Sequence, residues 1–424
     1  MLAVATAYSF WLGMNSVALR LDPQPGNGVP PTQPLACVIG DMDLLRPLGL
    51  AEIPCAAVAP PGAPPRYSRF TRAVVEWGDP SDESGALVDK LIRFARSQAL
   101  KPVLFYEGDW DLLLISRNRD RLAGHFHFVI PDGELVEDLV DKARFQNLAR
   151  NLGLPVPPST QVDTSTAGPE DVDLAFPLIL KPLTRRTATW MPIFTDLNRS
   201  EAKALEVRSR EELIALWPRL ASSGVELLAQ ELIEGPETSI ESYHAYVDRG
   251  GSIVASFTGQ KIRTYPKGYG HSTALEITAS AEVESLGAEL IKRLGLRGVA
   301  KLDFKRSPEG LLYLLEVNPR FSLWHHPGAK AGVNLPALVY DDMVEGTRRS
   351  TGPAEPGVRW CRLLNDVKAA REEGISFLRW LPWAMTCDAR ATLAWDDPLP
   401  FLRGVLWARA TTALRALRRR TARG

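Results

Sequence analysis

Short apolar runs alternate with amphipathic segments after residue 34. Residues 35–39 form an apolar run that ends at a glycine, which predicts a buried strand followed by a turn. Residues 84–98 instead place apolar side chains at helical spacing. Further strands are expected at 53–58, 73–76 and 102–106, and a helix at 43–50 capped by Asp43. Strands that alternate with helices predict a parallel α/β sheet, here in a unit that covers residues 35–135.

A second α/β pattern covers residues 136–345. One helix is expected over 135–152, because apolar residues recur at near-helical spacing and Gly153, followed by prolines, ends it. The other expected elements are helices at 210–220 and 280–294, strands at 176–180 and 226–232, and hairpins at 238–257 and 298–317. Both strands of the last hairpin end in charged or amide side chains, so several polar groups should meet in one cleft.

The two ends of the chain differ from these units. Residues 1–13 are apolar, but no Lys or Arg precedes them, which argues against a secretory signal. Residues 22–34 hold five prolines and two glycines, so 1–34 is interpreted as a leader and linker. Residues 346–424 form a Trp-rich extension expected to be helical, in which 403–424 carry seven arginines and no acid. A basic amphipathic helix there would dock on its own domain or make weak contact with an anionic membrane surface.

Composition excludes several classes of protein. The 424 residues allow two or three domains, and 50 basic residues balance 50 acidic ones, so net charge gives no argument for nucleic acid. No apolar stretch reaches the roughly 20 residues that span a bilayer. The four cysteines show no CxxC pair, which argues against a disulfide scaffold or zinc knuckle and indicates a cytoplasmic, reducing location. The first unit has no GxGxxG, so a dinucleotide fingerprint is absent.

Oxygen-bearing side chains gather on the last hairpin of the second unit. Asp303 lies on its first strand, and Glu316 and Asn318 lie on its second. If the strands are adjacent, Asp303 faces Glu316, Asn318 lies one pleat further on the same face, and Val317 points to the core. These are hard oxygen ligands, and Mg²⁺ takes few protein carboxylates and completes its shell with phosphate and water. The pattern predicts a magnesium site, and the alternative is a solvated acidic face.

Basic residues accompany this predicted metal site. Arg320 alternates onto the polar side, where its guanidinium could hold phosphate bidentately, and Lys301 shares a face with Asp303. Lys261 and Arg263 alternate onto one face of another strand. They are expected to bind phosphate and a substrate carboxylate respectively, unless this is a basic solvated strand. His325 and His326, with no other His or Cys at ligand spacing, are interpreted as pocket wall or structural residues.

These motifs resemble the ATP-grasp superfamily. The segment from Glu316 to Arg320, preceded by Asp303, is similar to its metal site. Three further segments follow the family's order: a helix opened by Lys142, an apolar strand ending in Lys181, and the hinge-like segment 229–237. The resemblance spans about residues 36–345. One such motif is common, whereas four in order are specific.

The resemblance implies a fold and a set of ligand contacts. It implies an N-terminal parallel α/β pre-grasp domain, a two-lobed ATP-grasp domain and a helical C-terminal extension. It implies ATP with one or two Mg²⁺, or Mn²⁺ instead. The implied contacts are Lys142 and Lys181 with the nucleotide phosphates, Gln230 or Glu231 with the adenine amino group, the backbone near Leu232 and Ile233 with its ring nitrogen, Glu237 with the ribose, and Lys301 and Arg320 with the transferred phosphoryl group.

The resemblance also implies an activity. In the family, ATP phosphorylates a carboxylate and an amine attacks the acyl phosphate, and the order of motifs is most similar to D-aspartate ligase and carbamoyl-phosphate-synthetase-like grasp domains. A carboxylate–amine ligase is therefore the first hypothesis. A small-molecule kinase and a non-catalytic nucleotide-binding module are the alternatives. Small carboxylates and amines would be the partners, with no nucleic acid, and a homodimer is one candidate assembly. Residues 183–199 lack the glycines of the usual flap, so hydroxyls and arginines would have to hold phosphate there.

Overall fold

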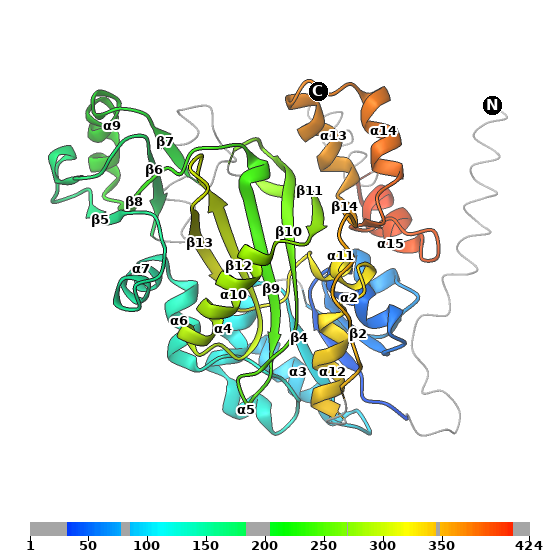
Figure 1. Cartoon of the computed structure of the whole chain (residues 1–424). Helices are drawn as coiled ribbons and strands as arrows, with labels where there is room; N and C mark the ends of the chain where they lie inside the picture. The colour runs from blue at the N-terminus through cyan, green and yellow to red at the C-terminus, as the bar shows by residue number, and fades with distance from the viewer. Residues whose placement is uncertain (1–31, 78–84, 184–203, 269, 345–347, 410–424) are drawn as a thin grey trace, which may run out of the picture.

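The computed structural model in Figure 1 describes residues 32–77, 85–183, 204–268, 270–344 and 348–409. Its first unit is a parallel sheet with strand order β3-β2-β1-β4, as the alternating pattern predicts. The strands are β1 (Ala36–Ile39), β2 (Cys55–Ala59), β3 (Thr71–Glu76) and β4 (Val103–Tyr106). The helical segments are α2 (Met42–Leu50), η1 (Pro64–Tyr67), α3 (Ala86–Arg96), α4 (Asp109–Arg117) and α5 (Arg119–Ala123). Because the chain leaves β1 toward β2 and later returns on its other side at β4, the carboxyl ends of β1 and β4 form a topological switch point.

The cap of α2 differs from the prediction. Asp41 caps the helix, since its carboxylate accepts a hydrogen bond from Met42 N at 2.7 Å. Asp43, the expected cap, lies inside the first turn, where it is buried and accepts from the indole nitrogen of Trp360 at 2.8 Å. Burial is the main reason that the pKa of Asp43 is raised, to about 8.

The single helix expected over 135–152 is two helices, α6 (Gly133–Val140) and α7 (Lys142–Asn151). Asp141 between them is extended, and its side chain accepts from Arg144 N at 2.9 Å as the cap of α7. The local hydrogen bond of an aspartate thus overrides the apolar periodicity that runs through both helices. As a result, Lys142 is the first residue of α7.

A small antiparallel sheet follows, with strand order β5-β8-β6-β7. One face packs on α9 (Arg210–Ser223) around Leu213, Trp217 and Leu220. Its strands are β5 (Ser159–Asp163), β6 (Leu178–Pro182), β7 (Leu205–Val207) and β8 (Glu226–Glu231), accompanied by the short turns η2 (Pro169–Asp171) and η3 (Glu237–Ser239). In Figure 1 this sheet lies to the left of the larger central sheet. The predicted flap at 183–199 lies outside the described residues, apart from Leu183.

The central sheet has seven strands in the order β13-β12-β9-β10-β11-β14-β15. Its main strands are β9 (Ile240–Val247), β10 (Ile253–Tyr265), β11 (His271–Thr278), β12 (Gly298–Arg306) and β13 (Leu312–Asn318). One face packs against α10 (Ala281–Leu294) and α7 through Leu302, Val317 and their neighbours. The opposite face carries Lys301 and Asp303 and, farther along, packs on α11 (His325–Lys330). The apolar core therefore lies behind the polar residues of the predicted site.

The C-terminal extension joins this sheet. It supplies β14 (Arg359–Cys361) and β15 (Ala389–Arg390), after α12 (Leu335–Val344). Its helical segments are α13 (Leu363–Glu372), α14 (Phe377–Met385), α15 (Leu399–Phe401) and η4 (Leu402–Trp407). The predicted domain boundaries stay predictions, as does the basic helix over 403–424, of which 410–424 lie outside the described residues. Across the described ranges, every helix is too short or too polar for a membrane span.

Candidate functional site

The two strands that carry the predicted metal ligands are paired. Asp303 of β12 lies opposite Glu316 of β13, and Lys301 lies opposite Asn318. Cross-strand partners project to the same face of a sheet, so these four side chains line one surface. Val317, between Glu316 and Asn318, is buried in the core. The predicted pairing of Asp303 with Glu316, and the inward direction of Val317, are confirmed.

Asp303 is buried and fully hydrogen-bonded. Its Oδ1 accepts from the hydroxyl of Ser242 on β9, and its Oδ2 lies 2.5 Å from Lys301 Nζ. Burial raises the pKa of this carboxyl, but Lys301 and then Lys261 outweigh it and hold the pKa below its ordinary value. Asp303 is therefore an anion, and Lys301 on the same strand stabilises its charge.

The donor set fits a magnesium ion shared with phosphate. Two carboxylates, Asp303 and Glu316, lie with the amide of Asn318, whose Nδ2 donates to Glu316 Oε1 at 3.0 Å. Within the described residues, no cluster of three or more His, Cys, Asp or Glu side chains could form a protein-only metal cage. Mg²⁺ in nucleotide sites takes one or two carboxylates and completes its shell with phosphate oxygens and water. These residues match that requirement.

Two lysines, one on the small sheet and one on α7, lie near the metal residues. Lys181 on β6 donates to Gln230 Oε1 at 2.8 Å, and Lys142 at the start of α7 donates to the carbonyl of Pro182 at 2.7 Å. Burial, aided by the charge of Lys142, lowers the pKa of Lys181 to about 8, while Glu316 acts in the opposite direction. The attraction between Lys181 and Glu316 shows that the two sheets bring their polar groups together. Two ammonium groups close to the predicted metal ligands are suited to a polyphosphate.

The predicted adenine contacts lie at the end of β8. Gln230 is buried and engaged by Lys181, while Glu231 Oε1 accepts from Ala175 N at 2.9 Å. The backbone N–H of Leu232 donates to Pro177 O at 2.9 Å, and Ile233 follows directly. The segment is thus tied to the residues before β6.

The hinge-like segment after β8 is held by a residue that the sequence prediction missed. Lys305, two positions after Asp303 on β12, donates to the carbonyls of Gly235 and Pro236 at 2.8 and 2.7 Å. Glu237 lies beside it, and burial raises the pKa of Glu237 even though Lys261 and Lys305 oppose the shift. The sequence did contain a signal for Lys305: it lies two residues after Asp303, and side chains two positions apart on a strand point to the same face.

Lys261 and Arg263 lie on opposite faces of β10, so the predicted shared face is wrong. Lys261 pairs with Leu275 of β11 and Arg263 pairs with Ala274, because the strand bulges between them. Successive residues of β11 point to opposite faces, and cross-strand partners share a face. Lys261 consequently acts on the metal side, whereas Arg263 is buried and donates to Asp366 through Nε and Nη2 at 2.8 and 2.7 Å.

The surroundings of Arg263 belong to the C-terminal helices. Its guanidinium carbon lies 4.0 Å from the ring centroid of Trp383, and Asp366 also accepts from Thr273 and Trp380. The predicted contact of Arg263 with a substrate carboxylate stays a prediction, and this enclosed geometry does not favour it.

Arg320 links the metal strand to the first sheet. Its Nε donates to Asp109 Oδ1 at 2.5 Å, and its Nη2 donates to Asn318 Oδ1 at 3.3 Å. Asp109 begins α4, next to Glu107, which accepts from Asp41 N at 2.7 Å. Burial is the main cause that raises the pKa of Glu107, to about 7. Sequence reasoning missed these acids, although their position after β4, at the switch point, was a signal.

Three histidines form an apolar wall beside the site. His325 and His326 are buried, and burial lowers the pKa of each to about 3. His244 on β9 is also buried, and its ring stacks on Phe257 with centroids 4.6 Å apart. Neutral, buried rings agree with the interpretation of His325 and His326 as wall or structural residues.

Comparisons with known proteins point to one family. The model of the family described as ATP-grasp in the biosynthetic pathway with Ter operon matches residues 223–363, which include the hinge segment and both metal strands. This part of the chain is similar in sequence to the ATP-grasp family. Individual known proteins also resemble this chain, some in sequence and some in fold.

Two relatives are carboxylate–amine ligases. D-aspartate ligase of Enterococcus faecium (strain Aus0004) is 24% identical over 295 residues, covering 66% of this chain and 68% of that protein. D-alanine–D-alanine ligase of Stutzerimonas stutzeri (strain A1501) is 28% identical over 222 residues, covering 48% of this chain and 63% of that protein. The chain thus spans about two thirds of the length of these curated relatives.

A solved structure extends the likeness to the fold. L-amino acid ligase from Bacillus licheniformis superposes with a TM-score of 0.53 at 15% identity, covering 74% of this chain and 75% of that chain. The predicted ATP-grasp fold, with its parallel N-terminal unit and helical C-terminal region, is confirmed.

Proposed function

We propose that this ATP-grasp protein is an ATP- and Mg²⁺-dependent ligase. It activates a small carboxylate as an acyl phosphate and joins it to an amine, with an amino acid as the first candidate for the carboxylate. The observation that carries this proposal is the pairing of Asp303 with Glu316, together with the attraction between Glu316 and Lys181 of the small sheet. The names of the relatives, which are ligases of D-aspartate, D-alanine and L-amino acids, support an amino-acid substrate.

Each group of ATP has a matching part of the cleft. Lys142 and Lys181 would hold phosphate oxygens, and the segment from Gln230 to Ile233 would hold adenine. Glu237, fixed beside β12 by Lys305, would accept from ribose hydroxyls. An apolar slot with a few directed hydrogen bonds is the usual form of a purine site.

Asp303 and Glu316 would hold the metal, together with Asn318. When bound there, Mg²⁺ neutralises phosphate charge and polarises the γ-phosphoryl group. Lys301 would turn its ammonium group from Asp303 toward the transferred phosphoryl group, since that oxygen-rich group carries more negative charge. No side-chain nucleophile is needed, because binding positions the carboxylate oxygen next to the phosphorus atom.

Arg320 would orient the acyl phosphate. Its hydrogen bonds to Asp109 and Asn318 fix the guanidinium between the first sheet and the metal strand. A rigid cation at that junction favours an anion that develops between the two units. The substrates would therefore enter beside the carboxyl ends of β1 and β4.

The test is ADP formation from Mg-ATP with pools of amino acids, followed by mass spectrometry of each active pool. ADP with a product one water lighter than its two substrates is expected. A phosphorylated product would instead indicate a kinase. Tight binding of Mg-ATP without turnover across the pools would indicate a binding module.

Two variants connect this assay to the metal pair. Glu316→Gln keeps the side-chain shape but removes the charge of a metal ligand, so turnover should fall at least about 100-fold while nucleotide binding remains. Glu309→Gln, in the exposed turn of the same hairpin, is the matched control and should retain activity. Unchanged turnover in Glu316→Gln would remove this metal assignment.

The remaining partners and the location follow from this proposal. Small carboxylates and amines are its substrates, and use of ATP agrees with the cytoplasmic location expected from the sequence. The assembly and any membrane contact through 403–424 stay predictions.

A further inference from the structure

Three arginines surround a hollow at the end of the central sheet where β12 begins. Arg119 belongs to α5, Arg249 to the turn between β9 and β10, and Arg297 directly precedes β12. The hollow measures about 290 Å³. Arg297 is six residues before Asp303 on an extended strand, about 20 Å away along the chain, so this is a different place from the nucleotide cleft.

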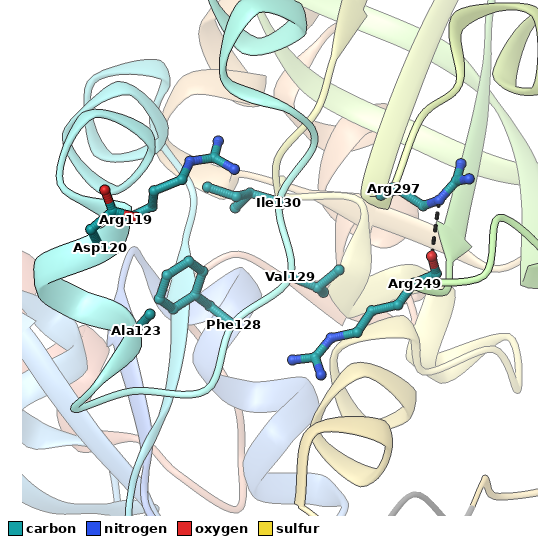
Figure 2. A pocket seen from close by; sticks show the side chains of 8 residues that line it. All are labelled: Arg119, Asp120, Ala123, Phe128, Val129, Ile130, Arg249 and Arg297. Carbon is teal, nitrogen blue, oxygen red and sulfur yellow. Dashed lines mark hydrogen bonds between the residues drawn. The ribbon is translucent and has the colours of Figure 1, made fainter.

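Two of these arginines are held in fixed positions by backbone carbonyls. Arg119 donates to Ser116 O and Pro131 O at 3.2 and 3.0 Å, and also to the hydroxyl of Ser116. Arg297 donates to Leu296 O at 2.8 Å and to Arg249 O at 3.2 Å. Figure 2 shows this last bond and the arginines on either side of Val129. Neutral acceptors position the guanidinium groups but leave their charges unbalanced.

The side chain of Arg249 extends into the hollow (Figure 2). Its guanidinium makes a long contact, from Nη2 to Met343 Sδ at 3.5 Å. A sulfur at that distance is a weak acceptor, so most of the five donors of this guanidinium remain available to a ligand.

The charge of the hollow is positive. Asp120 is the single acid among its lining residues, against three arginines. Considering only the described residues, none of these three guanidinium groups lies within 4.0 Å of a carboxylate. The pKa of the nearby His127 is lowered, first by burial and then by the positive charges of Lys101 and Arg249. Unpaired arginines around a concave surface concentrate anions.

The floor of the hollow is apolar. Phe128 and Ile130 line it together with the buried Val129 (Figure 2). A cavity of this size is near the lower limit for small-molecule sites, so it has room for about one ring with its substituent. Arginine donors recognise phosphate or carboxylate oxygens, while the apolar floor favours a ring or a short hydrocarbon part.

We propose that this hollow, here called the arginine hollow (Arg119, Arg249, Arg297 and the apolar residues between them), binds a small organic anion. The ligand carries a phosphate or carboxylate group on an aromatic or short apolar body. The site is separate from the nucleotide cleft and does not depend on the ligase proposal. Because it joins α5 of the first unit to two turns of the central sheet, a bound anion would tie these parts together.

Calorimetric titration of the full-length protein tests this inference. The probes are phenyl phosphate, benzoate and inorganic phosphate, each added in the presence of saturating Mg²⁺ and a non-hydrolysable ATP analogue that fills the nucleotide cleft. Saturable binding of one equivalent of phenyl phosphate or benzoate is expected, and the stronger of the two identifies the anionic group. Inorganic phosphate should bind more weakly, because it makes no use of the apolar floor.

Variants assign the binding to the hollow. Arg249→Glu should weaken binding of the stronger probe at least about tenfold, because it removes charged hydrogen bonds and adds a repulsive charge. Arg208→Ala, an exposed arginine on the small sheet, should leave the affinity unchanged. Absence of saturable binding by any probe, or equal affinities for wild type and Arg249→Glu, would overturn the proposal. Equal affinities for inorganic phosphate and phenyl phosphate would overturn the assigned apolar part.

Discussion

The lowered pKa of Lys181 makes nucleotide affinity depend on pH. In the nucleotide-free protein, burial and the charge of Lys142 lower this pKa to about 8, against the attraction of Glu316. Phosphate oxygens beside the ammonium group favour its charged form, so bound nucleotide raises the pKa again. Only the charged lysine attracts phosphate, and the apparent affinity therefore follows the charged fraction in the free protein.

The size of the effect follows from this value. With a pKa of about 8, about nine tenths of the lysine is charged at pH 7 and about one tenth at pH 9. The dissociation constant of a non-hydrolysable Mg-ATP analogue should therefore rise about tenfold between these pH values. At pH 9 binding should also take up about one proton per nucleotide.

Calorimetry at pH 7, 8 and 9 measures both quantities, if each pH is repeated in two buffers with different ionisation enthalpies. Lys181→Met should bind more weakly and show a flat pH profile over this range. Lys292→Met, an exposed lysine on α10, is the control and should keep the wild-type profile. A wild-type dissociation constant that stays the same from pH 7 to pH 9 would refute the reasoning.

Two further predictions concern the C-terminal extension. Asp366→Asn should lower the free energy of unfolding in urea by about 3–5 kcal/mol, because it leaves the buried Arg263 without its counter-charge. Asp173→Asn, at an exposed position, is the control and should change the free energy of unfolding little. Equal urea midpoints for wild type and Asp366→Asn would contradict this role of Asp366. Deletion of 410–424 removes five arginines but keeps η4, which packs on η1. The deletion should abolish co-sedimentation of the protein with anionic vesicles. Equal sedimentation of the full-length and shortened forms would contradict membrane contact.

Strand periodicity predicted the part of the site that lies on one hairpin. The bounds expected for β12 agree with Gly298–Arg306, and the facing of Asp303 and Glu316 follows from two adjacent strands with alternating side chains. These features depend on residues that are close in sequence. Local pattern was sufficient because the same alternation that buries Leu302 and Val317 exposes their neighbours.

Other features depended on events that leave no clear pattern. The bulge after Lys261 adds one residue to a strand without a distinctive composition, and it reverses the face of Arg263. The hydrogen bond between Arg320 and Asp109 joins residues 211 positions apart, so it follows only from the way the first sheet packs on the second unit. The break at Asp141 had a local signal, a capping side chain, which the apolar periodicity concealed.

The alternation along β12 has a consequence for how such a protein can diverge. Lys301, Asp303 and Lys305 belong to the proposed site, whereas Ala300, Leu302 and Phe304 belong to the core. Residues of the site and residues of the core therefore alternate along one strand. Insertion or loss of a single residue there would exchange the two sets and destroy both. Variation that alters substrate choice is therefore confined to other segments, such as the loops after β1 and β4. Residues of these loops do not alternate with core residues, so a change there leaves the core intact.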